Sequence, residues 1–367
     1  MYGADASAQL ERDLLSSIQD GLRTKRPILV HVNADTTWLL QLPYPPGAPR
    51  PPNRSRFNIL LDPWLKGSQS DVAAWFSSQW HTINSCVPSI AELNRVIYET
   101  EELEGGRYPG AKTTSCMEVP NRIDAVIVSH EFTDHCHKQT LHEIHPATPI
   151  IATNAGAGGA ANLIKSWRYF DTVLETPPFS ENVSNWHTTS SWPLPDWIGI
   201  SRIVSASDVL NYHSAVLIAF RLNRVPSGEG QGLSQDAEAE AVIYTPHGIS
   251  GPDLRCVKAA NPPIRTLALL HGLHDIRISV KQLNLGAHNG LQAQRMCRAK
   301  YWIGTHDEIK HAGGFVKTVL HRKILTLKDA LLAERKEKTE IKPADELIEM
   351  ADVSFADLGS GESLILL

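Results

Sequence analysis

The chain has 367 residues, of which 42% are hydrophobic, and it carries a formal net charge of −5. This length and composition suffice for one large hydrophobic core or two ordinary ones, as in a globular enzyme. The acidic balance gives no general attraction to phosphate backbones, which argues against a nucleic-acid partner.

Membrane insertion and secretion are not indicated. No apolar run approaches the roughly 18 residues that cross a bilayer, and the first residues lack the basic and apolar regions of a signal peptide. The five cysteines are odd in number and show no paired spacing, which suits a reducing compartment. We therefore expect a cytoplasmic protein without a membrane span; the sequence carries no signal for its oligomeric state.

The first 24 residues are predicted to contain an amphipathic helix, because apolar residues recur near helical spacing over residues 6–22. Strands are expected next at residues 28–32, 37–41 and 57–61. Six prolines within residues 43–52 require a loop between the second and third of these strands. The third strand ends at Asp62, which we expect to order the turn before Pro63.

Two helices are expected between this first group of strands and the next strand. They cover residues 71–81 and 89–103 and belong to an insertion at about residues 65–118.

The most informative stretch of the chain is His130-Glu-Phe-Thr-Asp134-His135. It follows an apolar strand at residues 123–128 and precedes a helix-like segment at residues 137–144. Imidazoles and a carboxylate this close together at a strand end can converge on one point, and zinc and manganese prefer these ligand types. The alternative is a polar turn in which Asp134 caps the helix.

Strands and helices continue to alternate through the rest of the chain. Strands are expected at residues 149–152, 197–205, 215–221, 240–244, 266–270 and 301–304, helices at 154–165 and 288–299, and a Gly- and Ser-rich hairpin loop at 226–239. The glycines near residue 156 lack the spacing of a nucleotide-binding turn. The C-terminal segment (321–367) is expected to pack on the same domain. It contains a charged helix at residues 328–341 and an apolar tail at 364–367 that can pair with a sheet edge.

With these motifs the sequence resembles the metallo-β-lactamase fold superfamily, whose signature loop reads His-x-His-x-Asp-His after a core strand. His130, Asp134 and His135 match this loop, and Phe132 replaces its second histidine. Further along, the positions that match the family's ligands are His213, His247 (where the family has a bridging aspartate) and His306. Residues 58–64, 267–272 and 283–286 are similar to the branch that holds ascorbate-6-phosphate lactonase and the N-acylphosphatidylethanolamine phospholipase D.

This resemblance covers residues 25–315 and implies the fold. We expect an α/β chain whose residues 25–320 form a four-layer αββα sandwich, with two sheets packed face to face and helices outside. The proposed ligands all stand at or just after strand ends, so they are expected to meet at one edge of the sandwich.

The resemblance also implies a metal centre, with two departures. Phe132 offers no lone pair, and His247 cannot bridge two ions as a carboxylate does, so one divalent ion is expected in place of two. The favoured ligands are Asp134, His135 and His306, with His247 as a fourth. The rival set is His130, His213 and His247.

Zinc is the favoured ion, with manganese and iron as alternatives. Cys136 and His137 are expected to pack beside the ligands rather than to bind the ion.

A centre of this kind supports hydrolysis, because a bound divalent ion activates water and polarises a carbonyl or phosphoryl oxygen. We expect a small-molecule ester, lactone, amide or phosphodiester as substrate, and His130 and His213 as catalytic groups that move a proton. Phe132, His271 and His274 are assigned to substrate binding, and several tryptophans near strand ends are candidates for an apolar pocket wall. The alternatives are a member of the fold that binds a ligand or partner without catalysis, and a non-hydrolytic metal enzyme with lyase or redox chemistry.

Overall fold

The computed structural model describes residues 21, 24–71, 73, 75–104, 120–154, 158–205, 208, 212–222, 239–341 and 353–367. The expected N-terminal helix and the expected hairpin loop at residues 226–239 lie almost wholly outside these ranges. Among the helices within them, none has both the length and the apolar character needed to cross a bilayer.

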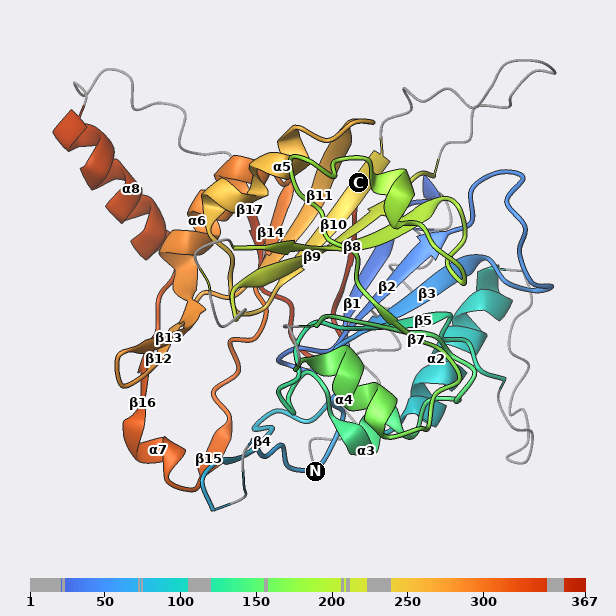
Figure 1. Cartoon of the computed structure of the whole chain (residues 1–367), viewed down its shortest axis with the longest axis horizontal. Coiled ribbons are helices and arrows are strands. Elements are labelled where there is room, and N and C mark those ends of the chain that lie inside the picture. Colours follow the sequence, from blue (N-terminus) through green and yellow to red (C-terminus); the bar gives the residue numbers. More distant parts are fainter. Residues whose placement is uncertain are drawn as a thin grey trace.

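The first sheet is built from strands of both ends of the chain (Figure 1). Its order is β18-β1-β2-β3-β5-β6-β7. Pairing is antiparallel from β18 to β3 and parallel from β3 to β7. The strands are β1 (Ile28–His31), β2 (Trp38–Pro43), β3 (Arg56–Leu61), β5 (Ala125–Val128), β6 (Ile150–Ala152), β7 (Val173–Glu175) and β18 (Ser363–Ile365).

The second sheet faces the first and has the order β17-β14-β11-β10-β9-β8. Its strands β10, β11, β14 and β17 run parallel to one another. The strands are β8 (Ile198–Val204), β9 (Ser214–Phe220), β10 (Ala239–Thr245), β11 (Ile264–His271), β14 (Tyr301–Ile303) and β17 (Ser354–Ala356).

Helices cover the outer faces of the two sheets (Figure 1). The helices that cover the first sheet are α2 (Ile90–Glu104), α3 (Lys138–Leu141) and α4 (Ala160–Ser166). On the second sheet lie η2 (Gly251–Leu254), α5 (Arg255–Lys258) and α6 (Gly286–Cys297). Helix α8 (Leu327–Ile341) lies beside α6, and Arg295 of α6 is 3.6 Å from Glu334. The short helices η1 (Trp186–Thr189) and α7 (Val316–Val319) complete the set within the described residues.

Alternation along the strands produces this layering, because successive side chains of a strand point to opposite faces of its sheet. In β5, Val126 contributes to the core under the helices and Ile127 to the core between the sheets. In β10, Val242 lies between the sheets and Ile243 lies under α5 and α6. Helices, sheet, sheet and helices therefore form four layers, and the expected αββα sandwich is confirmed.

The C-terminal tail adds an edge strand to both sheets. The expectation that residues 364–367 pair with a sheet edge is confirmed, since Leu364 is the register partner of Leu29. Strand β17 likewise pairs with β14.

The expected helix at residues 71–81 is wrong. In the described part of that segment the chain turns and then forms β4 (Ser78–Trp80), which pairs with β15 (His311–Gly313). The partner of β4 lies more than 200 residues away in sequence, so the local apolar spacing carried no information about this pairing.

A small three-stranded sheet outside the sandwich was also not expected from the sequence. It consists of β12 (Asp275–Ile278), β13 (Lys281–Leu285) and β16 (Leu320–Lys323), in the order β13-β12-β16. With α7, β15 and β4 it forms the lower left part of the molecule in Figure 1.

Candidate metal centre

Loops that follow strands of both sheets meet at one edge of the sandwich. Asp35 and Asp62 follow β1 and β3, and His135 follows β5, all in the first sheet. His247 follows β10 and His306 follows β14 in the second sheet. Loops on a rigid scaffold are a common location for binding and catalytic groups.

Three buried histidines converge at this edge. The Nε2 atoms of His135 and His247 are 3.1 Å apart, and the ring of His306 lies 5.0 Å and 5.2 Å from the rings of these two, measured between centroids. One ring nitrogen from each of the three residues lies within 4.8 Å of the others. This spacing allows the three imidazoles to hold one ion.

Buried carboxylates orient two of these imidazoles. Asp62 Oδ2 lies 2.7 Å from His135 Nδ1, and the two carboxylate oxygens of Asp35 lie 3.1 Å and 3.2 Å from His306 Nδ1. A neutral imidazole that donates its Nδ1–H to a carboxylate presents the Nε2 lone pair on the other side of the ring, which here faces the centre. Metal-bound histidines commonly have such a carboxylate behind them.

The third imidazole is kept neutral. Burial, reinforced by the neighbouring rings of His135 and His130, lowers the pKa of His247 well below its usual value. At His135, burial alone would lower the pKa, but the carboxylates of Asp134 and Asp62 outweigh this effect and raise it. His247 is therefore a neutral imidazole that can donate a lone pair, and the carboxylates beside His135 favour a positive charge at this location. Both features fit a divalent ion.

Asp62 does more than order its turn. It adopts a left-handed conformation (φ 42°), and its carboxylate accepts hydrogen bonds from the Ser129 backbone nitrogen at 2.7 Å and the Tyr244 hydroxyl at 2.8 Å. These bonds tie the end of β3 to β5 and β10. The orientation of His135 therefore depends on contacts from both sheets.

Asp35 was missed by the sequence reasoning. Its turn is closed by Asn33 Oδ1, which accepts hydrogen bonds from the backbone nitrogens of Asp35 and Thr37 at 2.9 Å each. The His306 backbone nitrogen donates to Asp35 O at 2.8 Å, and His306 itself is left-handed (φ 60°). The available signal was a polar Asn-x-Asp segment directly after a buried strand, the same type of position that marked Asp62.

Asp134 lies beside the three histidines and is paired with a lysine. Its Oδ1 is 3.6 Å from His135 Nε2, and its Oδ2 is 3.9 Å from His306 Nε2. Lys310 Nζ lies 2.9 Å from Asp134 and 2.6 Å from Asp35. Burial would raise the pKa of Asp134, but Lys310 and His135 hold it well below its usual value.

The rival histidine set does not converge in the described part of the chain. His130 stacks on Phe132, with 4.1 Å between ring centroids, and lies 5.0 Å from the His247 ring. His213 Nδ1 is directed to the backbone oxygen of His247, at 3.3 Å. The groups whose ligand atoms could share an ion there are His135, His247 and His306, and Asp35, Asp134 and His306.

His137 rather than Asp134 caps α3. Its side chain accepts a hydrogen bond from the Thr140 backbone nitrogen, and its ring also contacts the Thr140 hydroxyl at 2.9 Å. Cys136 is buried, and burial raises the pKa of its thiol. Both residues therefore pack next to the site, as their positions in the sequence suggested.

A cavity of about 350 Å³ opens beside the three histidines. The residues that line it include His247, His306, Asp134 and Lys310, and the apolar and aromatic side chains of Phe76, Phe132, Tyr212, Ile276, Leu283 and Val316. The small sheet β13-β12-β16 supplies much of that wall. No tryptophan is among the described residues that line it, so the expected tryptophan wall is replaced by phenylalanine, tyrosine and aliphatic side chains.

Of the three residues assigned to substrate binding, Phe132 lines this cavity. The two ring nitrogens of His271 lie 2.7 Å from Gly272 O and 2.8 Å from Asn289 Oδ1. His274 Nδ1 lies 2.9 Å from Arg322 Nη1, and burial and this arginine lower the pKa of His274 to about 4. Neither histidine is among the described residues that line the cavity, although Arg322, the partner of His274, does line it.

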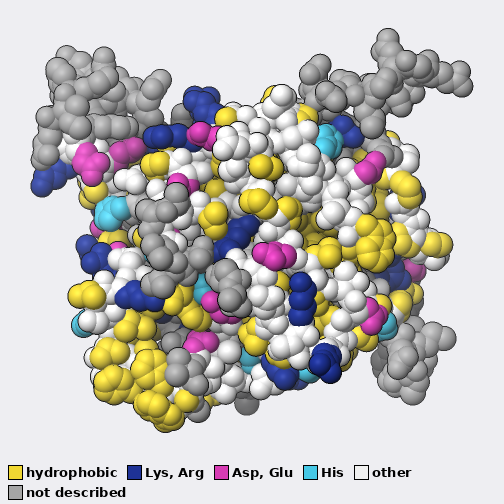
Figure 2. Space-filling model, viewed as in Figure 1, with side chains coloured by type: hydrophobic (Ala, Val, Ile, Leu, Met, Phe, Trp, Pro, Cys, Tyr) yellow, Lys and Arg dark blue, Asp and Glu magenta, His cyan; other side chains and the backbone are white. Residues whose placement is uncertain are grey.

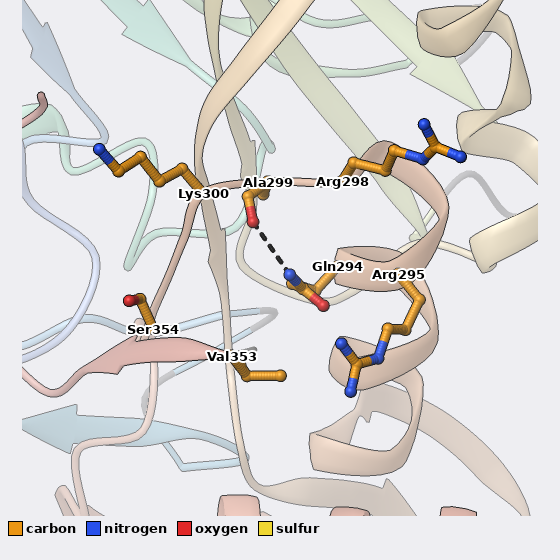
Figure 3. Close-up of a pocket in the computed structure, with 7 residues that line it drawn as sticks. All are labelled: Gln294, Arg295, Arg298, Ala299, Lys300, Val353 and Ser354. Carbon is orange, nitrogen blue, oxygen red and sulfur yellow. Dashed lines mark hydrogen bonds between the residues drawn. The ribbon is translucent and has the colours of Figure 1, made fainter. Parts of the chain in front are cut away.

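A second cavity, of about 500 Å³, lies at the end of α6 and the start of β17 (Figure 3). The side chains of Arg295, Arg298 and Lys300 border it but point in different directions. Arg295 is 3.6 Å from Glu334, and Lys300 Nζ donates to Leu367 O at 3.0 Å. These cations do not converge on a common point, so this cavity does not have the arrangement of an anion-binding site.

No protein-family model and no curated protein matches the chain. Several solved structures are similar to it, among them the following three. One is a possible metal-dependent hydrolase from Veillonella parvula, which is 12% identical, with 93% of this chain and 100% of that chain covered and a TM-score of 0.48. Another is an isothiocyanate hydrolase from Delia radicum gut bacteria, which is 12% identical, with 92% and 99% covered and a TM-score of 0.49. A third is the metallo-β-lactamase fold protein YhfI from Bacillus subtilis, which is 11% identical, with 92% and 99% covered and a TM-score of 0.43.

The chain has the four-layer sandwich and the strand-end histidines that its resemblance to the metallo-β-lactamase fold superfamily implied.

Proposed function

We propose that the chain is a metal-dependent hydrolase that holds one divalent ion through His135, His247 and His306, with Asp134 beside them. The observation that carries the proposal is the pair of buried carboxylates behind His135 and His306, which turns the Nε2 lone pairs toward one point. Zinc is the ion we favour, because a set of three imidazoles and one carboxylate suits it, with manganese and iron as alternatives.

A bound divalent ion would activate a water molecule and polarise the substrate. His130 is the proposed proton acceptor because its ring lies 5.0 Å from the His247 ring, measured between centroids. Burial and His135 lower its pKa well below the usual value, which keeps the imidazole neutral but makes it a weak base. His213, directed to the backbone oxygen of His247, is better assigned to positioning the His247 loop.

The cavity wall supports a small substrate with an apolar body. Phe132 and Tyr212 stack on each other and on His130, with 5.4 Å between the first two rings, and present an aromatic surface next to His247. Small esters, lactones, amides and phosphodiesters remain the proposed substrate classes. We assign substrate contact to Phe132, which lines the cavity, rather than to His271 and His274, which are not among the described lining residues.

A hydrophobic surface outside the cavity supports the same type of substrate. Phe76, which lines the cavity, lies 5.9 Å from Trp75 and 6.3 Å from Phe315, measured between ring centroids, and both of these are exposed. Figure 2 shows hydrophobic side chains gathered at the lower left, where Figure 1 has α7 and β15. An apolar group could therefore contact protein on its way into the cavity.

A cytoplasmic location is also part of the proposal. Cys86, Cys136, Cys256 and Cys297 are free and buried, as suits a reducing compartment.

Hydrolysis should depend on the metal. With a panel of activated esters, lactones, amides and phosphodiesters, we expect turnover that a chelator abolishes and added Zn²⁺ restores, with a rate that rises with pH through an ionisation near neutrality. His135→Ala should lose this turnover. His288→Ala, which removes an exposed imidazole on α6, should keep it.

A panel without metal-dependent turnover, on a chain that still binds the ion, would contradict the hydrolase proposal. It would favour a non-catalytic binding protein or a lyase or redox enzyme.

A further inference from the structure

Lys310 is a buried cation at the candidate metal centre. Its side chain is 5% exposed, and Nζ lies 2.6 Å from Asp35 Oδ2 and 2.9 Å from Asp134 Oδ2. The indole ring of Trp64 lies beneath it, with Nζ 5.2 Å from the ring centroid. A lysine this buried is found where carboxylates compensate its charge.

The two carboxylates that hold Lys310 belong to a possible ion site of their own. One oxygen of Asp35, one of Asp134 and one nitrogen of His306 lie within 4.8 Å of one another. Two carboxylates and an imidazole are a ligand set that holds divalent ions. This group shares His306 with the three-histidine group, so the two groups are adjacent. Because one imidazole nitrogen holds one ion and His306 Nδ1 contacts Asp35, a second ion would rest on the carboxylates of Asp35 and Asp134.

The charge of Lys310 prevents Asp35, Asp134 and His306 from acting as a second ion site. Two buried carboxylates close together need a positive charge between them, because like charges in a buried location disfavour each other. The ammonium of Lys310 contacts both carboxylates and supplies that charge permanently. A divalent ion would have to displace the lysine to bind there.

We infer that the ammonium of Lys310 occupies the position of a second divalent ion and so limits the centre to one. This inference rests on the proposed metal function. It goes beyond the loss of ligands at Phe132 and His247, because it names a residue that fills the second position. Lys310 engages Asp35 Oδ2 and Asp134 Oδ2 and keeps these two atoms from binding a second ion, while Asp134 Oδ1 faces His135 and the first ion.

The test is the number of ions bound by variants that lack this charge. Zn²⁺ is titrated into the metal-free full chain, and bound zinc is counted by calorimetry and by elemental analysis after dialysis. The unchanged chain is expected to bind one ion, and Lys310→Met, which removes the charge and nearly preserves the length, is expected to bind two. Lys310→Gln should also bind two, and its amide can donate hydrogen bonds to the carboxylates if the methionine variant does not fold.

Two controls separate this effect from a general change of charge. Lys281→Met removes another cavity-lining lysine, whose Nζ lies 3.7 Å from the Tyr212 ring centroid, and should bind one ion. The double variant Asp35→Asn with Lys310→Met removes a carboxylate of the second group and should return the count to one.

One ion in both Lys310 variants would overturn the inference and make the lysine an ordinary structural ion pair, while leaving the proposed metal function intact. Two ions in the unchanged chain would also overturn it. No ion in the unchanged chain would overturn the proposed metal function itself, so the failure of one is distinguished from the failure of the other.

Discussion

His135→Ala and His306→Ala are each expected to lower the affinity for a divalent ion by about 100-fold or more. Binding of a structural zinc ion is worth about 10–16 kcal/mol, so one of four ligands accounts for roughly 3 kcal/mol of it, and 1.4 kcal/mol corresponds to a factor of ten. Both residues present Nε2 to the centre and are oriented there by a carboxylate. A competition titration against a coloured chelator measures the change.

His137→Ala is the matched control, because it removes a buried imidazole from the same loop. The His137 ring caps α3 through Thr140, and its Nε2 lies 3.4 Å from the backbone oxygen of Ser68, so metal affinity should change by less than about threefold. If His137→Ala stripped the ion and His306→Ala retained it, the assignment of His306 as a ligand would be wrong.

Asp62→Ala is expected to lower the free energy of unfolding of the metal-free chain by about 3–5 kcal/mol. The carboxylate is fully buried and accepts hydrogen bonds from the Ser129 backbone nitrogen and hydroxyl, the Tyr244 hydroxyl and His135 Nδ1. Alanine would leave these donors buried without a partner. Urea denaturation followed by tryptophan fluorescence measures the loss.

Asp171→Ala, which removes an exposed carboxylate, should change the same free energy by no more than about 0.5 kcal/mol. A loss below about 1 kcal/mol for Asp62→Ala would show that Asp62 does not hold the ends of β3, β5 and β10 together.

The layers of the fold could be predicted because they follow from local patterns. Apolar strands such as the one at residues 215–220 and the one before His130 are visible in the sequence, and each forms a strand in the structure, β9 and β5. The histidines could be found for the same reason, since each follows a recognisable strand. Parallel pairing places the ends of these strands at one edge of each sheet, so the residues that follow them lie close together.

The parts that could not be predicted depend on contacts between distant segments. The small sheet β13-β12-β16 pairs Ile276 with Arg322, and no periodicity in either strand indicates its partner. Asp35 was missed because it precedes His306 by 271 residues, and Lys310 because a single lysine in a loop gives no sign that it will be buried. The role of Asp62 was underestimated for the same reason.

The central claim is that this chain binds one divalent ion through three histidines at the edge of the sandwich. The most direct measurement is the ratio of metal to protein in the purified chain, determined by elemental analysis after dialysis. We expect close to one equivalent of zinc, manganese or iron per chain. Two tightly held ions would contradict the one-ion centre, and a chain that holds none and takes up none when zinc is added would contradict the metal account as a whole.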